Sequence, residues 1–137
     1  IVTVVETITA NAQDVFKVLG DFGRIKVGGA ITAFELEGDG VGAMRTITMG
    51  DGQVIERLDE HDSERLVFGY SILNEDNPLP VSNYSAHLEI TANDENTCTV
   101  NWSGTFEPKG TDEAAASKVV RRIYTGGIAG TRKALGC

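Results

Sequence analysis

The feature that most constrains the fold is a run of six strand-like segments between residues 31 and 108. Each segment alternates apolar with polar residues or is rich in β-branched and aromatic ones, and Gly, Asp, Asn or Pro separates it from the next. Short separators of this kind connect neighbouring strands of an antiparallel sheet, so we expect one such sheet over this stretch. Its strands are predicted within ITAFELEG, GAMRTITM, QVIERLDEH, ERLVFGYSIL, NYSAHLEITA and TCTVNWSGTFEP.

The segments on either side of this run complete an α+β domain. Residues 1–8 are typical of a strand, and residues 11–20 have the apolar spacing of a short helix. A second short helix is expected over residues 21–29, and a long one from Thr111 to residue 135. Helices gathered on one face of an antiparallel sheet make an α+β fold, and a chain of 137 residues is long enough for one domain, here residues 1–137.

The hairpin MRTITMGDGQVIERL carries two charged side chains on the face that should turn inward. If Asp51-Gly52 forms a two-residue turn, Ile47 pairs with Glu56. Arg45 then pairs with Leu58 and lies diagonal to Glu56 on the same face. Buried charges are costly unless they are paired or used. This leaves three alternatives: a pair that only neutralises itself, a pair in water at the rim, or the polar groups of a ligand site.

The strands after this hairpin bring aromatic side chains to the same face. A three-residue turn over residues 62–64 keeps the alternation in phase and places Glu56 opposite Tyr70. Alternation also turns Tyr84 and Trp102 inward, where Trp102 is either a core residue or a platform for stacking. With one residue of the long helix, the predicted ligand contacts are Arg45, Ile47, Glu56, Phe68, Tyr70, Tyr84, Trp102 and Ile123.

The long helix is expected to turn one apolar stripe toward the sheet. That stripe is formed by Val120, Ile123, Gly127 and Leu135. Glycines at 126, 127 and 130 weaken the helix by about 1 kcal/mol each relative to Ala. Their small size either leaves space beneath the helix or serves close packing or a kink.

The link NEDNPLPVS, residues 74–82, is longer than the other separators and holds two prolines. Long ordered loops are often functional, so this one is either a lid or a stiff connection.

The charge balance argues against a nucleic-acid partner. Twelve Lys and Arg face 20 Asp and Glu, a net charge of −8, whereas binding to phosphates needs a basic surface. The apolar runs are too short for insertion into a membrane. His61 and His87 are isolated from other metal-binding residues, so we expect no metal and no cofactor.

Cys98 and Cys137 show neither metal-ligand spacing nor a disulfide framework, and are expected to be free thiols. No secretory signal pattern opens the sequence, and we therefore expect a cytoplasmic location.

Several blocks, in this order of elements, resemble the START-like superfamily, also called SRPBCC or Bet v 1-like, and within it the bacterial polyketide cyclase/dehydrase-like branch. They are AQDVFKVLGDF, GDGVGAMRTITMGDGQVIERLDEHD, RLVFGYSI, PLPVSNYSAHLEI and VNWSGTFEP. The resemblance implies a helix-grip fold, in which a curved seven-stranded antiparallel sheet wraps around the long C-terminal helix. It also implies a hydrophobic cavity between the two, and the ERLD and NY segments match segments that place Glu56 and Tyr84 at such a cavity.

Two functions follow as hypotheses. The first is binding of a small, largely hydrophobic ligand in the cavity, with formation of a homodimer left open. The second is a polyketide cyclase or dehydratase, in which Glu56 is the candidate base and Arg45 or Tyr70 stabilises an enolate oxygen. Burial would raise the pKa of Glu56, as a general base requires, whereas the nearby Arg45 would lower it. The role of Glu56 as a base therefore competes with the role of Arg45 as a donor beside it. A third hypothesis, an interaction module, would need an apolar outer sheet face, and the alternation predicts a polar one.

Overall fold

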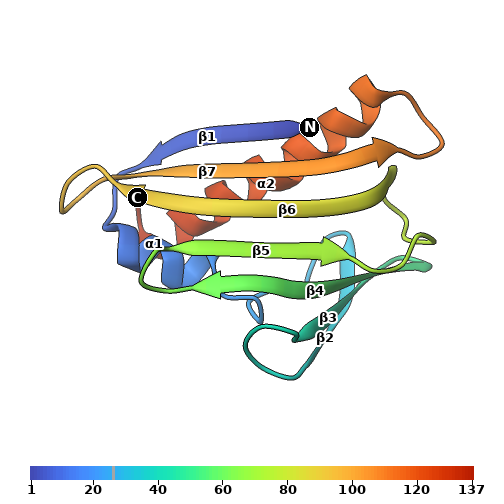
Figure 1. The fold of residues 1–137 in the computed structure, drawn as a ribbon, viewed down its shortest axis with the longest axis horizontal. Helices are drawn as coiled ribbons and strands as arrows, with labels where there is room; N and C mark the ends of the chain where they lie inside the picture. The colour runs from blue at the N-terminus through green and yellow to red at the C-terminus, as the bar shows by residue number, and fades with distance from the viewer. Residues whose placement is uncertain (26) are drawn as a thin grey trace.

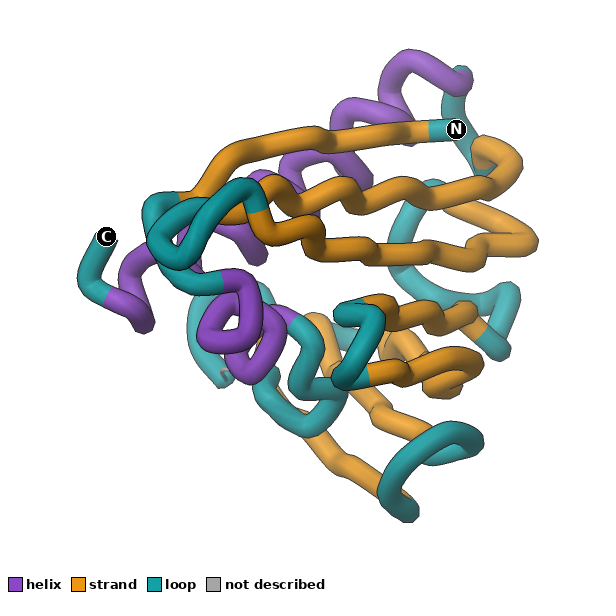
Figure 2. Tube along the Cα trace, turned by 60° about the vertical axis from the view of Figure 1, so that its left-hand side comes forward, coloured by secondary structure: helices purple, strands orange, loops and turns teal. Residues whose placement is uncertain are grey.

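A computed structural model describes residues 1–25 and 27–137 of the chain. The elements are β1 (Val2–Ile8), α1 (Ala12–Leu19), β2 (Ile31–Glu37), β3 (Met44–Met49), β4 (Gly52–Asp62), β5 (Val67–Ile72), β6 (Val81–Ala92), β7 (Cys98–Pro108) and α2 (Glu113–Leu135). The strands form one antiparallel sheet in the order β1-β7-β6-β5-β4-β3-β2 (Figure 1). Both helices lie on one side of this curved sheet (Figure 2), which confirms the predicted α+β helix-grip fold.

The prediction of a second short helix over residues 21–29 is wrong for the part that the structure describes, because none of residues 21–25 and 27–29 is helical. Asn11 caps α1 as expected, and Gly20 ends it. The chain then makes a turn in which Asp21 Oδ1 accepts a hydrogen bond from the Gly23 N–H over 3.0 Å. The carboxylate that would have capped a new helix is therefore used in the turn. The turn also carries Phe22 into the core, where it is buried.

The β3–β4 hairpin turns one residue earlier than predicted. Met49 pairs with Gly52, and Arg45 lies directly opposite Glu56 rather than diagonal to it. The turn is therefore Gly50-Asp51, and Gly50 has a φ of +62°, as the first central residue of a type II′ turn requires. The pairing moves by two residues, which leaves every side chain on its predicted face.

The β4–β5 turn is longer than predicted, and a β-bulge in β4 accompanies it. Asp62 pairs with Val67, so the turn covers residues 63–66 and not 62–64. The register shifts between Leu58 and Glu60, so that Leu58 lies opposite Tyr70 and Glu56 lies opposite Ile72. The predicted pairing of Glu56 with Tyr70 is therefore wrong. A bulge adds one unpaired residue to a strand, and its position cannot be predicted from the alternation of apolar residues or from the turn residues.

The C-terminal helix turns Val120, Gly127 and Leu135 toward the sheet as predicted, because Val120 is buried, Gly127 lies against the Trp102 ring and Leu135 packs against the core. The helix differs from the prediction at Ile123 and at its first residue. Its N-cap is Asp112 rather than Thr111, and its buried residues are Ala116, Val120, Tyr124, Ile128 and Thr131. Ile123 is 41% exposed, so the prediction that it faces the sheet is wrong. The apolar residues at 120, 123, 124 and 128 allow either Ile123 or Tyr124 to face the sheet. Tyr124 does so because its buried hydroxyl is hydrogen-bonded to that of Tyr84.

The link between β5 and β6 is held by many hydrogen bonds, which favours the stiff-loop alternative. Asn74 Oδ1 accepts from the Ile55 N–H over 2.9 Å, and its Nδ2 donates to the Gln53 carbonyl. Lys109 Nζ donates to the carbonyls of Glu75 and Asn77.

Candidate functional site

A space of about 740 Å³, the main cavity, lies between the sheet and the C-terminal half of α2. The sheet contributes Arg45, Phe68, Tyr70 and Trp102 to its lining. The end of α1 and the segment after it contribute Val18, Leu19, Asp21, Arg24 and Ile25, and α2 contributes Gly127, Gly130, Thr131, Lys133 and Ala134. The cavity thus has an aromatic wall on the sheet and small residues on the helix.

Four of the eight residues predicted as ligand contacts line the main cavity, namely Arg45, Phe68, Tyr70 and Trp102. Ile47, Glu56, Tyr84 and Ile123 are not among its lining residues. The contributions of α1 and α2 were missed, apart from the helix glycines. Of the two alternatives for those glycines, Gly130 fits open space, because a Cβ there would meet nothing within 4 Å. Gly127 fits close packing, because a Cβ there would meet the Trp102 ring at 3.0 Å.

Arg45 and Glu56 form a buried ion pair. Arg45 Nε donates to Glu56 Oε1 over 2.6 Å, and the residues are only 8% and 6% exposed. This rules out the alternative of a solvated pair at the rim. A charge-assisted hydrogen bond of this length is what keeps two charges tolerable away from water.

The Arg45 guanidinium is fixed by further contacts. Its Nη1 donates to the Phe22 carbonyl over 3.0 Å, and its Cζ lies 4.2 Å from the centre of the Phe22 ring and 5.3 Å from that of Tyr70. A guanidinium has five N–H groups, and the hydrogen bonds found within the described residues use two of them. Because Glu56 balances its charge, Arg45 presents hydrogen-bond donors at the cavity wall without a net charge.

All three tyrosines of the chain meet in one buried cluster beside the main cavity. The Tyr84 hydroxyl is hydrogen-bonded to that of Tyr124, and the Tyr70 and Tyr84 hydroxyls lie 3.4 Å apart. Burial raises the pKa of all three phenols above its ordinary value. At neutral pH the cluster therefore offers neutral hydroxyls and no phenolate base.

Trp102 joins the tyrosine cluster to the cavity wall. Its ring stacks on Tyr124, with ring centres 4.3 Å apart and planes inclined by 13°. Its buried Nε1–H has no hydrogen-bond partner among the described residues. Of the two predicted roles, core residue and stacking platform, Trp102 has the geometry of both, since it is buried and also lines the cavity.

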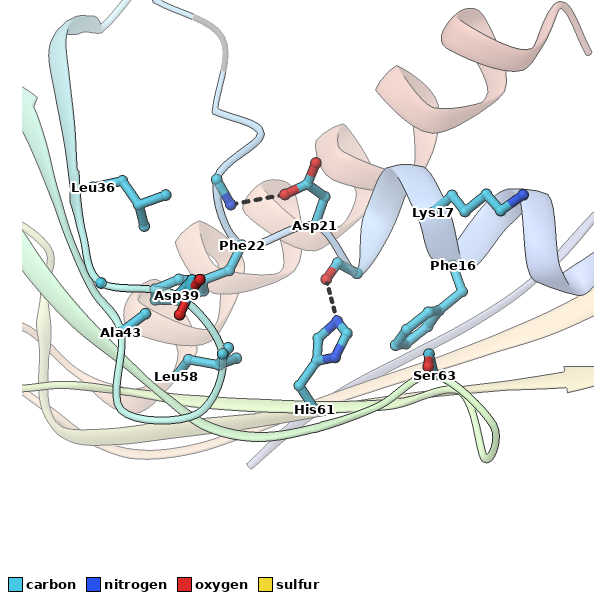
Figure 3. Close-up of a pocket in the computed structure, with 14 residues that line it drawn as sticks. Phe16, Lys17, Asp21, Phe22, Leu36, Asp39, Ala43, Leu58, His61 and Ser63 are labelled. Carbon is cyan, nitrogen blue, oxygen red and sulfur yellow. Dashed lines mark hydrogen bonds between the residues drawn. The ribbon is translucent and has the colours of Figure 1, made fainter.

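A second space of about 360 Å³, the lateral cavity, lies beside α1 (Figure 3). Its apolar lining includes Phe16, Phe22, Leu36, Ala43 and Leu58, and its polar lining includes Lys17, Asp21, Asp39, His61 and Ser63. His61 Nε2 lies 3.1 Å from the Gly20 carbonyl. None of these residues was predicted as a site, because they come from segments that the sequence separates widely.

Within residues 1–25 and 27–137, no group of three or more His, Cys, Asp or Glu is arranged to hold a metal ion. The same part of the chain contains no helix of the length and hydrophobicity needed to cross a membrane.

Comparison with known proteins gives one family and several structures of the same fold. The family described as polyketide cyclase / dehydrase and lipid transport matches residues 1–136. XoxI from Bacillus cereus is 27% identical with a TM-score of 0.81, over 96% of this chain and 92% of that one. Ara h 8.0201 is 21% identical, with a TM-score of 0.77 over 96% and 93%. Norcoclaurine synthase from Thalictrum flavum, in complex with dopamine and hydroxybenzaldehyde, is 20% identical, with a TM-score of 0.73 over 98% and 84%. No curated protein matches the chain significantly.

Proposed function

Because the chain belongs to the polyketide cyclase / dehydrase and lipid transport family, within the START-like superfamily, we propose that it binds a small, largely hydrophobic molecule in the main cavity. The observation that carries the proposal is a space of about 740 Å³ walled by Phe68, Tyr70 and Trp102. Pockets for small organic ligands are typically about 300–1,000 Å³ and mostly apolar, with a few polar groups that fix orientation.

The polar wall supports one class of ligand within this proposal. Arg45 lines the cavity with N–H groups to spare, and its charge is already balanced by Glu56. At Arg45 a ligand carboxylate would meet a charge that Glu56 already balances, whereas a neutral carbonyl would accept a hydrogen bond without adding a charge. We therefore expect the ligand group that meets Arg45 to carry a neutral acceptor oxygen, while Arg24 and Lys133 are the cationic side chains of the same cavity that could pair with an acidic group elsewhere on the ligand.

Fluorescence titration with prodan, a neutral naphthyl ketone, tests this proposal. The matched variants are Gly130→Leu and Gly126→Leu, which lie in the same helix at positions where a Cβ meets nothing within 4 Å. Only Gly130 lines the main cavity. We expect prodan to bind the wild type and Gly126→Leu alike, and Gly130→Leu about tenfold more weakly because leucine occupies the space. Equal affinity for all three proteins, or no binding to the wild type, would contradict the proposal.

Catalysis of the cyclase or dehydratase type is the second candidate. Arg45 and the Tyr70 hydroxyl favour it, because donors on the cavity wall could stabilise an enolate oxygen. Two observations argue against Glu56 as the base: it is hydrogen-bonded to Arg45, and it does not line the cavity.

Deuterium exchange at the methyl group of 2-acetylnaphthalene in D2O, followed by NMR, separates the two candidates. Faster exchange with the wild type than with Glu56→Gln would support an enzyme that uses Glu56 as its base. If neither protein accelerates the exchange but the ketone still binds, the result would support ligand binding without catalysis.

A further inference from the structure

The lateral cavity is separate from the main cavity, and Phe22 forms the wall between them. Phe22 lines the lateral cavity, while Arg45, whose Cζ lies 4.2 Å from the centre of the Phe22 ring, lines the main one. Asp21 borders both spaces. A molecule in the lateral cavity would therefore contact a different set of side chains from a ligand in the main cavity.

The floor of the lateral cavity suits one aromatic ring. Its apolar part is formed by the buried side chains of Phe22, Ala43 and Leu58 on one side of His61, with the Phe16 ring on the other side (Figure 3). A space of about 360 Å³ lies near the lower end of the range for small-ligand pockets.

His61 gives the cavity a fixed hydrogen-bond acceptor. Its Nε2 lies 3.1 Å from the Gly20 carbonyl, and because a carbonyl only accepts, Nε2 must carry the hydrogen. In the neutral imidazole Nδ1 is then the acceptor. The ring is held between Phe16, at 5.2 Å between ring centres, and Phe68, at 6.2 Å.

The charged side chains at the rim of the lateral cavity determine which sign of ligand charge it favours. Asp21 and Asp39 line the cavity with two carboxylates, against the single ammonium group of Lys17. Oδ1 of Asp21 accepts from the Gly23 N–H, which leaves its second oxygen for a ligand. The charged side chains of the lining therefore favour a cation, since two of them are carboxylates and one is an ammonium group.

We propose that the lateral cavity is a second binding site, for a small molecule with one aromatic ring and a protonated amine. The ring lies against Phe22 and Leu58, and the ammonium group pairs with the carboxylate of Asp39 at the rim. This proposal does not rest on the function proposed for the main cavity.

NMR titration of the full chain with benzylammonium tests the proposal, with benzyl alcohol and benzoate as neutral and anionic counterparts. The chain has two histidines: His61 lines the lateral cavity, and His87 lies half-exposed beside Glu60, outside it. We expect benzylammonium to shift the His61 ring signals and leave those of His87 in place. Its affinity should exceed that of benzyl alcohol about fivefold, and benzoate should bind weakest. Equal affinities, or no shift at His61, would overturn the proposal.

Three variants locate the binding. Asp39→Asn should weaken benzylammonium binding about two- to fivefold, as expected for a partly exposed charge pair. Asp51→Asn removes the same charge from an exposed turn outside the cavity and should have no effect. Gly130→Leu fills the main cavity and should leave the His61 shifts unchanged. Loss of those shifts in Gly130→Leu, or equal effects of Asp39→Asn and Asp51→Asn, would refute the lateral site and leave the main-cavity proposal standing.

Discussion

Breaking the Arg45–Glu56 pair should destabilise the protein far more than replacing it. The variants are Arg45→Met, Glu56→Gln and the double variant Arg45→Met/Glu56→Leu. Both groups are more than 90% buried and joined over 2.6 Å, so removal of one leaves the other charged in an environment of low polarity.

The magnitudes differ between the two single variants, because the two partners are supported unequally. Glu56 has no side-chain hydrogen bond within the described residues except that from Arg45, so Arg45→Met should cost about 3–5 kcal/mol. In Glu56→Gln, Arg45 keeps the Phe22 carbonyl, two ring contacts and an amide acceptor, and the cost should be about 1–3 kcal/mol. The double variant should lie within about 1 kcal/mol of the wild type, since apolar side chains of similar volume commonly replace a buried pair without loss.

Urea unfolding at pH 7, followed by circular dichroism, measures the free energies of unfolding of the wild type, these three variants and the single variant Glu56→Leu. The double-mutant cycle of wild type, Arg45→Met, Glu56→Leu and Arg45→Met/Glu56→Leu should give a coupling of about 2 kcal/mol or more between the two side chains. A coupling below about 0.5 kcal/mol, the size found for exposed pairs, would refute the reasoning that the pair is shielded from water.

Three further predictions concern packing, pH and the β5–β6 link. In Gly104→Ala the added Cβ would collide with the Tyr124 hydroxyl, so the free energy of unfolding should fall by about 1–3 kcal/mol, whereas Gly126→Ala, where a Cβ meets nothing, should not lower it. Equal urea midpoints for these two variants would contradict this. Because the folded state raises the pKa of Tyr70, Tyr84 and Tyr124, it holds their protons longer than the unfolded chain does. Stability should therefore be unaffected by these groups below about pH 9 and fall above about pH 10, with no tyrosinate absorbance at 295 nm before unfolding. Early tyrosinate absorbance in the folded protein would show that the cluster is open to solvent. Asn74→Ala removes hydrogen bonds to the backbone of Gln53 and Ile55 and should cost about 1–3 kcal/mol in urea unfolding, and a loss under 0.5 kcal/mol would count against a stiff link.

The alternation of apolar and polar residues was enough to predict which face of the sheet the strand residues of the β3–β4 hairpin occupy. Alternation is a local property with a period of two residues, and even a two-residue change of register at Gly50 leaves Arg45 and Glu56 on the same side. For that reason the strand residues of the main cavity, Arg45, Phe68, Tyr70 and Trp102, could be named in advance. Asn11 and Gly20 could likewise be predicted as the caps of α1, because capping depends on side chains within a few residues of the helix end.

The tertiary structure alone decided how distant segments meet. The longer β4–β5 turn and the bulge after Leu58 together placed Glu56 opposite Ile72 and not Tyr70. The choice between Ile123 and Tyr124 as the inward residue of α2 depended on a hydroxyl partner in β6, 40 residues away. The lateral cavity arises only where α1, the turn at Phe22 and the inner face of β4 converge. Such contacts depend on the energy of packing between elements, which no single segment encodes, whereas the faces of strands and the ends of helices are set by neighbours along the chain.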